Sequence, residues 1–156
     1  MPGPSSRAAR GGRRPRARKA IAVAWGEFNE TITGEMRDRA VAAIEAAGYR
    51  AEPVLAVSGA YDLPFAIDRA LARRDVVGAV AIGCIITGET RHDDLIAHAS
   101  AKALLDVSIA RGKPVGLGVT GPGQTYEQAK DRVDRAEAAV EAVLKLLAAD
   151  GKTRGR

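Results

Sequence analysis

One stretch of the chain, Gly83 to His98 (GCIITGETRHDDLIAH), joins an apolar run to a cluster of ionisable side chains. The apolar run ends at a polar turn, and a predicted helix follows. Backbone N–H groups are unpaired at the start of a helix, and anions bind there. Glu89 through its backbone and Thr90 through its hydroxyl suit a phosphate, and His92 can transfer protons near neutral pH. We therefore expect the chemistry at this turn.

Other functions of the same residues are weaker interpretations. A metal site would use His92, Asp93, Asp94 and His98, but the two histidines are about 600° apart around a helix, so one helical face cannot present both. Cys84 and His92 would make a nucleophile pair, yet the position of Cys84 within the apolar run favours a small buried hydrophobe. A surface histidine without a function remains the alternative for His92.

Three more regions of the sequence carry candidate ligand-binding residues. Phe28 follows the predicted strand 21–25 and either packs on its neighbours or stacks on a ring-shaped ligand. Asp62 follows the predicted strand 49–57 and either binds sugar hydroxyls or caps the next helix. Arg132, one turn into the last predicted helix, is either solvated or paired with a phosphate.

Strand and helix patterns alternate four times along the chain. The predicted strands are 21–25, 49–57, 76–86 and 115–119, and the predicted helices are 31–47, 64–74, one from Asp93 or Asp94 to Arg111, and one from Thr125 to about Leu147. The run 76–86 is apolar throughout, as in a central strand covered on both faces, whereas Pro53 favours an edge for its strand. This alternation predicts an α/β fold, a three-layer α/β/α sandwich with a four-stranded parallel sheet.

Ligands of such sheets bind beyond the carboxyl ends of the strands. The loops expected at that edge contain Phe28 and Asn29, Ala60 to Asp62, Gly88 to His92, and Thr120 to Gly123. The glycine and proline of the fourth segment predict a loop after a short strand. The sequence thus predicts that four separate regions meet at one site.

Charge divides the chain into a body and two basic ends. Residues 1–19 hold seven of the 24 Lys and Arg residues and none of the 19 acidic residues, so the remainder has 17 basic and 19 acidic residues, a net charge of −2. We expect a disordered basic arm at 1–19, an α/β domain at 20–149 and a short basic tail at 150–156. The arm is a solvated tail, a tether for a polyanion or an organelle transit segment, and it lacks aromatic residues that would stack on bases.

Several classes of protein are disfavoured by composition. No apolar run approaches the roughly 18 to 20 residues that a membrane helix needs, and the N-terminus lacks the apolar core of a secretory signal. The single cysteine excludes an internal disulfide framework and a multi-cysteine zinc site. We expect a soluble cytoplasmic protein with no membrane contact, no metal and no redox cofactor.

Four motifs carry a resemblance to a known family. They are FNETIT at 28–33, GAYDLP at 59–64, GCIITGETRHDDLIAH at 83–98, and LGVTGPGQT with EQAKDRV between 117 and 133. In this order they resemble the lumazine synthases of riboflavin biosynthesis, and the GPG after the fourth strand is similar to the archaeal-type branch. The resemblance implies a flavodoxin-like sheet and a transferase.

The implied reaction condenses 5-amino-6-(D-ribitylamino)uracil with 3,4-dihydroxy-2-butanone 4-phosphate. The 5-amino group attacks the ketone to give an imine, phosphate leaves, and ring closure with loss of water gives 6,7-dimethyl-8-ribityllumazine. The resemblance implies that no metal and no cofactor take part.

The resemblance also implies a role for each residue of the pyrimidine half of the site. Phe28 stacks on the pyrimidine ring. The ribityl chain is lined by Ala60, Tyr61 and Asp62. The pyrimidine is contacted, largely through backbone atoms, by Cys84, Ile85 and Ile86.

For the phosphate half, the resemblance implies that Glu89 and Thr90 hold the phosphate and that His92 is the proton-transfer residue. Arg132 matches a phosphate-binding arginine supplied by a neighbouring subunit. Leu117 occupies a position where many relatives have Phe, which implies looser packing on the ring.

At the level of assembly, the resemblance implies pentamers with active sites between neighbouring subunits, which assemble further into decamers or sixty-subunit shells in some relatives. Two other functions stay open from the residues themselves. One is a flavodoxin-like module that binds a flavin or a similar phosphate-bearing ring without turning it over. The other is an assembly protein whose basic arm binds nucleic acid or another polyanion.

Overall fold

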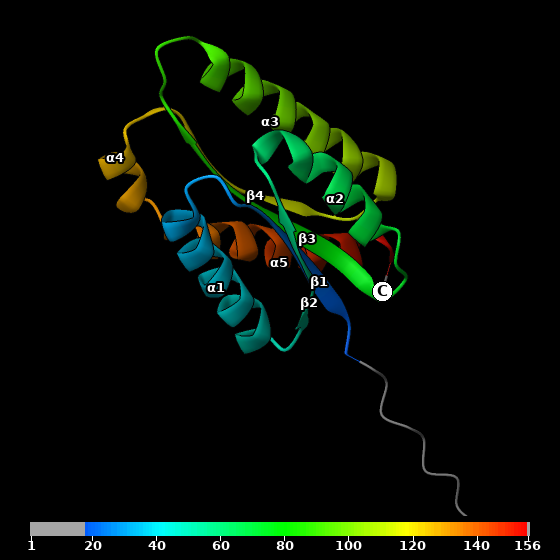
Figure 1. Cartoon of the computed structure of the whole chain (residues 1–156). Helices are drawn as coiled ribbons and strands as arrows, with labels where there is room; N and C mark the ends of the chain where they lie inside the picture. The colour runs from blue at the N-terminus through cyan, green and yellow to red at the C-terminus, as the bar shows by residue number, and fades with distance from the viewer. Residues whose placement is uncertain (1–17, 156) are drawn as a thin grey trace, which may run out of the picture.

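The protein is an α/β sandwich, described here by a computed structural model for residues 18–155 (Figure 1). The strands are β1 (Ala20–Gly26), β2 (Arg50–Val57), β3 (Val76–Ile86) and β4 (Val115–Gln124). The helices are α1 (Glu30–Ala46), the short 3-10 helix η1 (Ala60–Asp62), α2 (Leu63–Leu71), α3 (His92–Arg111), α4 (Tyr126–Lys130) and α5 (Arg135–Thr153). Each strand is followed by at least one helix, as the sequence pattern predicts.

The four strands form one parallel sheet in the order β2-β1-β3-β4. This order confirms the predicted flavodoxin-like sheet, with β3 in its interior and the Pro53-containing β2 at its edge. Pro53 is tolerated there because an edge strand has one side without ladder hydrogen bonds. All carboxyl ends of the strands consequently face the same edge of the sheet.

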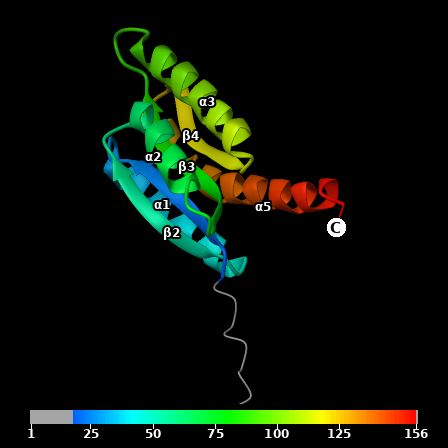
Figure 2. The same ribbon diagram turned by 90° about the vertical axis from the view of Figure 1, so that its right-hand side faces the viewer.

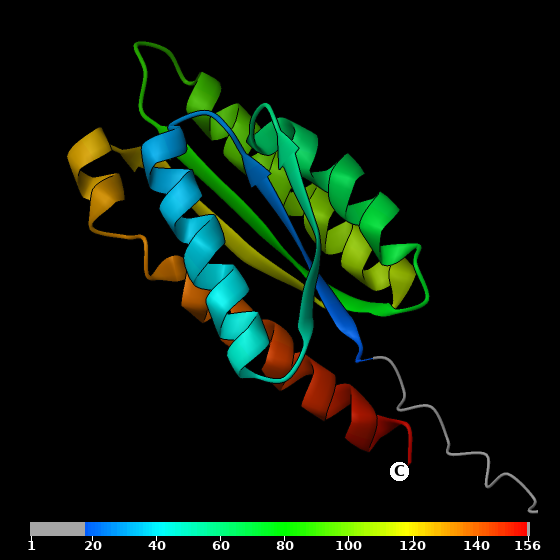
Figure 3. The same cartoon turned by 60° about the horizontal axis from the view of Figure 1, so that its bottom comes forward.

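Alternate side chains of β1 enter two different cores, one on each face of the sheet. Ile21, Val23 and Trp25 pack with helices α1 and α5, whereas the small residues Ala20, Ala22 and Ala24 pack with α2 and α3. Figures 1 and 3 show these helix pairs on opposite faces of the sheet. Burial on both faces explains why β1 and β3 are apolar without alternation.

The fourth strand differs from its prediction. β4 does not stop at Val119 but continues to Gln124. Thr120 pairs with Cys84 and Gln124 pairs with Ile86, so residues 121–123 bulge outward opposite a single residue of β3. Hydrogen bonding resumes after the bulge, so the glycines and proline that predicted a loop interrupt the strand without ending it.

Two helix predictions near the site are also corrected. The last helix is not continuous: α4 ends at Lys130 and α5 begins at Arg135, so Arg132 lies in the turn between them rather than within a helix. The predicted helix start at Thr125 is confirmed, because Thr125 and Gln128 form a capping box there. Asp93 and Asp94 do not cap α3, because the helix already begins at His92 and they lie in its first turn.

Both described ends of the chain lie away from the carboxyl edge of the sheet. β1 starts at Ala20 on the opposite edge, and α5 extends to Thr153, beyond the sheet (Figure 2). Residues 1–17 of the expected basic arm lie outside the described residues. Within residues 18–155, no helix is both long and apolar enough to cross a membrane.

Candidate active site

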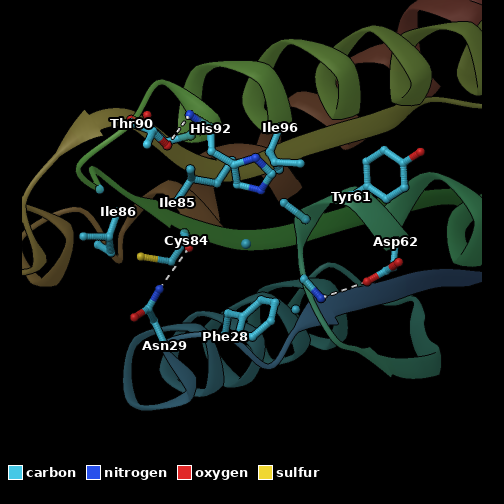
Figure 4. Close-up of a pocket in the computed structure, with 16 residues that line it drawn as sticks. Phe28, Asn29, Tyr61, Asp62, Cys84, Ile85, Ile86, Thr90, His92 and Ile96 are labelled. Carbon is cyan, nitrogen blue, oxygen red and sulfur yellow. Dashed lines mark hydrogen bonds between the residues drawn. The ribbon is translucent and has the colours of Figure 1, made fainter.

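A cavity of about 510 Å³ opens at the carboxyl edge of the sheet (Figure 4). The loops after β1 and β2 contribute Phe28, Ala60, Tyr61 and Asp62 to its lining. The end of β3 and the loop after it contribute Cys84, Ile85, Ile86, Thr90 and His92. Phe28 lies on one wall and His92 on the opposite wall, with Cys84 and Ile85 between them. Nine residues predicted from the sequence therefore meet in one cavity.

The wall formed by Phe28 is held by backbone contacts between two loops. The N–H of Phe28 donates to the carbonyl oxygen of Ser58 at 3.1 Å. A Cβ atom on Gly59 would lie 2.6 Å from the Phe28 ring, so only glycine allows the ring to rest on this loop. The ring is still 69% exposed, which leaves a surface on which a planar ligand can stack.

Next to Phe28, Asn29 fastens the first loop to the central strand. Its side-chain amide donates to the carbonyl oxygen of Cys84 at 3.2 Å. Asn29 has a φ of 62°, a left-handed conformation that asparagine adopts more readily than most residues. Its own carbonyl accepts the first helical hydrogen bonds of α1, from Ile32 and Thr33. Strain at this residue is therefore balanced by contacts on both sides.

On the side of the cavity formed by the loop after β2, Asp62 holds η1 in place. One of its carboxylate oxygens accepts from the backbone N–H of Gly59 at 3.1 Å, and it makes no side-chain cap on α2. Asp62 therefore occupies the predicted N-cap position of α2, but its side chain bonds to the loop before η1 and not to α2. Tyr61, beside it, is 68% exposed. An exposed carboxylate and phenol at this end of the cavity can accept or donate hydrogen bonds to a polyhydroxylated chain.

The floor of the cavity is the end of β3. Cys84 is buried and reduced, and burial raises the pKa of its thiol above the ordinary value. A neutral thiol is a poor nucleophile, which favours the interpretation of Cys84 as a small buried hydrophobe. A ligand can therefore form hydrogen bonds here mainly with the backbone N–H and carbonyl groups of Cys84, Ile85 and Ile86.

His92 is the first residue of the 20-residue helix α3. Its backbone N–H donates to the Thr90 hydroxyl oxygen at 3.3 Å, so Thr90 acts as the acceptor for one of the unpaired N–H groups. The hydroxyl hydrogen of Thr90 remains free to donate to an anion. The imidazole of His92 faces the cavity (Figure 4). Both an anion-binding helix start and a titratable ring are thus present at one point.

Comparison with known proteins identifies the family. The family model of 6,7-dimethyl-8-ribityllumazine synthase matches residues 18–150. The chain belongs to this family. It is 45% identical over 128 residues to the 6,7-dimethyl-8-ribityllumazine synthase of Staphylothermus marinus, covering 81% of this chain and 85% of the relative.

Two other relatives with the same description agree with this assignment. The one from Halobacterium salinarum is 46% identical over 121 residues, which is 77% of this chain and 90% of the relative. The one from Methanocaldococcus jannaschii is 40% identical over 121 residues, with 78% and 86% covered. These archaeal relatives confirm the resemblance to the archaeal branch. The chain is a lumazine synthase, a transferase of riboflavin biosynthesis.

Three residues that the resemblance to lumazine synthases assigned to the site lie outside this cavity. Glu89 is exposed in the loop before α3. Leu117 is on β4, 53% exposed, where it lines a groove with residues of α3. Arg132 lies beyond the end of β4, where it donates to the side-chain oxygen of Gln124 at 3.0 Å. Their roles in the lumazine synthase reaction stay predictions.

Sequence reasoning missed Asp93 and Ile96 as lining residues of the lumazine synthase site, and it placed Asn29 in a loop at this edge without assigning it a role. Asp93 had been considered only as a metal ligand or as the cap of the following helix. Its carboxylate instead accepts from the backbone N–H of Gly123 at 3.3 Å, which joins the loop before α3 to the bulge of β4. Asp93 and Ile96 are three residues apart, a spacing that predicts a shared face of a helix. Their place in the cavity lining depends on α3 starting at His92.

Proposed function

We propose that this lumazine synthase condenses 5-amino-6-(D-ribitylamino)uracil with 3,4-dihydroxy-2-butanone 4-phosphate in the cavity between Phe28 and His92. The amine nitrogen bonds to the ketone carbon and water leaves, which gives an imine. Loss of a proton from the carbon chain then lets phosphate depart with the electrons of its C–O bond. The enol that remains tautomerises to a ketone, and the ribitylamino nitrogen closes the ring on this new carbonyl with loss of a second water.

The pyrimidine occupies the half of the cavity that Phe28 and the β3 end line. The exposed ring of Phe28 supports stacking, and the backbone of Cys84 to Ile86 lies across from it. The ribityl chain extends toward Ala60, Tyr61 and Asp62. Asp62 uses one oxygen for Gly59, and its other oxygen accepts from a ribityl hydroxyl.

The phosphorylated ketone occupies the half of the cavity next to α3. The N-terminus of this long helix and the Thr90 hydroxyl, together with the backbone of Glu89, bind the phosphate. His92 transfers the protons that imine formation and phosphate departure require, because its imidazole faces the cavity beside the same helix start. Holding the two substrates together contributes much of the acceleration, up to about 7–11 kcal/mol in favourable cases.

A second copy of the chain completes the site. Arg132 binds the phosphate of a neighbouring subunit, and Leu117 packs against the neighbour's pyrimidine. Two observations support this proposal: both side chains are exposed outside their own cavity, and several apolar side chains of α3 are exposed as well. These are Leu95, Leu105 and Ile109 of α3. We propose a pentamer as the basic unit, in which these surfaces are covered.

The observation that carries the proposal is the meeting of Phe28, Asp62 and His92 in one cavity, since each comes from a different loop. The test incubates purified protein with both substrates and follows lumazine absorbance and phosphate release. We expect both products in equal amounts, and no product when either substrate is omitted. Tight binding of the pyrimidine without phosphate release would support a binding module instead.

The basic N-terminal arm is a second functional element of the chain, and we propose that it contacts polyanions. Its seven basic residues precede Ala20, which begins β1 at the edge of the sheet opposite the cavity. Contact through phosphate charge alone weakens steeply with salt. A chain that lacks residues 1–17 should retain its turnover and lose salt-dependent binding to heparin, whereas equal binding by both chains would contradict the proposal. We also propose that the enzyme is cytoplasmic.

A further inference from the structure

Gln124, at the end of β4, is a buried polar residue that no step of the reaction uses. Its side chain is 0% exposed. Its amide nitrogen donates to the Thr120 hydroxyl at 2.9 Å and to the Ile85 carbonyl at 3.2 Å, and its oxygen accepts from Arg132 at 3.0 Å. We propose that Gln124 is a positioning residue that holds Arg132 for the phosphate of the neighbouring subunit, which rests on the proposed role of Arg132.

The orientation of the Gln124 amide follows from its partners. The Ile85 carbonyl can only accept a hydrogen bond, so the amide nitrogen must face it. The guanidinium of Arg132 can only donate, so the amide oxygen must face Arg132. The reversed amide would place two acceptors together at one end and two donors at the other. Only one orientation of Gln124 is therefore compatible with this burial.

The other end of the network is the Ile85 carbonyl of β3, beside the β4 bulge. Residues 121–123 bulge outward opposite Ile85, so the regular pairing of β3 with β4 is interrupted there. A Cβ atom on Gly121 would lie 2.3 Å from the Ile85 oxygen, which shows how closely the bulge passes this carbonyl. The side-chain amide of Gln124 donates a hydrogen bond to the same carbonyl at 3.2 Å. Gln124 is thereby anchored to β3, the most interior element of the site.

This anchoring has a consequence for Arg132. The turn between α4 and α5 is exposed, and a long arginine side chain there would otherwise sample many rotamers. One guanidinium N–H bonded to a rigid, buried acceptor removes much of that freedom and leaves the other N–H groups for a phosphate. The cation is then preorganised before the ketone phosphate binds. The same residue ties Arg132 to Ile85, which lines the cavity of its own subunit.

The test is a double-mutant cycle on the assembled enzyme with Gln124→Met, Arg132→Ala and their combination. Methionine keeps the shape of the side chain and removes both hydrogen-bonding ends. We expect Gln124→Met to raise the KM for the phosphorylated ketone by roughly 3- to 10-fold while the KM for the pyrimidine changes little. In the Arg132→Ala background the same substitution should add almost nothing to the ketone KM.

Two further variants separate positioning from general damage. Thr120→Val removes a partner at the nitrogen end of the amide only, so its ketone KM should stay near that of the unmodified enzyme. Gln124→Asn keeps a buried amide beside β3, but its side chain is too short to reach Arg132. This variant replaces Gln124→Met in the test if the methionine variant does not fold. It should show the same selective rise in KM.

Two outcomes would overturn the proposal, and they are distinguishable. The positioning role alone is refuted if a folded Gln124 variant has an unchanged KM for the ketone. It is also refuted if the rise in this KM is equally large in the Arg132→Ala background. If Arg132→Ala itself leaves the ketone KM unchanged, the phosphate role of Arg132 is refuted and Gln124 has nothing to position. A selective rise that disappears in the Arg132→Ala background supports the proposal.

Discussion

At the scale of single residues, the cavity owes its chemistry to a short turn that ends in His92. Thr90 accepts the His92 N–H, so the helix starts at the residue that carries the imidazole. The side chain is thereby directed into the cavity while the helix N-terminus faces the same space. Asn29 and Asp62 complete the arrangement through hydrogen bonds to backbone groups of the facing loops.

Replacing His92 by alanine tests its proposed role in proton transfer. We expect turnover to fall by about 10²–10⁴-fold, because general acid–base catalysis typically contributes this factor. The melting temperature should change little, since His92 is exposed and its backbone contact to Thr90 does not need the ring. Steady-state kinetics and thermal unfolding measure the two quantities.

The matched control for this substitution is His98→Ala, six residues further along α3 and also exposed. It lies outside the cavity lining but in the groove beside Leu117, so the assembly mass of this variant is measured as well. Its turnover should stay within a few-fold of the unmodified enzyme. Equal losses for the two histidines would contradict a specific role for His92.

At the scale of elements, the bulge of β4 joins the cavity to the turn that bears Arg132. Gly121 and Gly123 both have positive φ values, 92° and 75°. They differ in their surroundings, because a Cβ on Gly121 meets the Ile85 oxygen whereas a Cβ on Gly123 meets no atom within 4 Å. The pair therefore separates backbone strain from steric overlap.

We predict that Gly123→Ala lowers the free energy of unfolding by about 1–2 kcal/mol, the usual cost of a left-handed conformation. Gly121→Ala should cost more, because the same strain is combined with a clash against the β3 backbone. Chemical denaturation of the two variants measures the difference. Equal losses would mean that the bulge can move away from Ile85.

A second link between elements lies at the opposite edge of the sheet. Asp75, which precedes β3, accepts hydrogen bonds from Arg73 and from Arg50 of β2. The guanidinium groups of Arg73 and then Arg50 hold the pKa of this carboxyl well below its usual range. The interaction therefore ties the edge strand to the turn that leads into the central strand.

This pKa predicts how stability depends on pH. A carboxyl whose pKa is lowered by folding stabilises the protein fully above its unfolded pKa, about 4, and this contribution disappears as the pH falls below that value. The melting temperature of Asp75→Asn should therefore lie below that of the unmodified protein at pH 7, with a gap that narrows toward pH 3. Salt should reduce the gap as well, because the carboxyl is exposed. A gap independent of pH would contradict the ion pair as its source.

At the scale of the whole molecule, we propose that one chain contains only part of the site. The loops after β1, β2 and β3 meet in the cavity, whereas Arg132 and Leu117 do not line it. Leu105, one of the exposed apolar residues of α3, lines the same groove as Leu117. A second subunit would cover this groove and exchange the missing residues.

Mixing two inactive variants tests this exchange directly. In co-expressed pentamers of His92→Ala and Arg132→Ala chains, a site that takes the two residues from neighbouring subunits is intact in about one quarter of random arrangements. We therefore expect activity at low ketone concentration to recover to roughly that fraction. The activity of each variant alone should stay low. If mixed assemblies of confirmed pentameric mass recover no activity, both residues act in the same subunit's site.

The sequence alone determined the layers of this protein and most of its cavity. Apolar runs such as 76–86 are read from local composition, and parallel strands bring their following loops to one edge whatever the details. Phe28, Asp62 and His92 could therefore be predicted to meet, and the four motifs pointed to the family.

Only the tertiary structure decided the features that depend on contacts between distant residues. The extension of β4 to Gln124 depends on pairing with β3, which outweighs the local turn signal of glycine and proline. The links of Asn29 to Cys84 and of Gln124 to Ile85 join residues that are 55 and 39 positions apart, a separation that no local pattern reveals. Arg132 lies outside a helix because the chain turns between α4 and α5. Its hydrogen bond to Gln124 depends on the pairing of β4 with β3, which the sequence does not reveal.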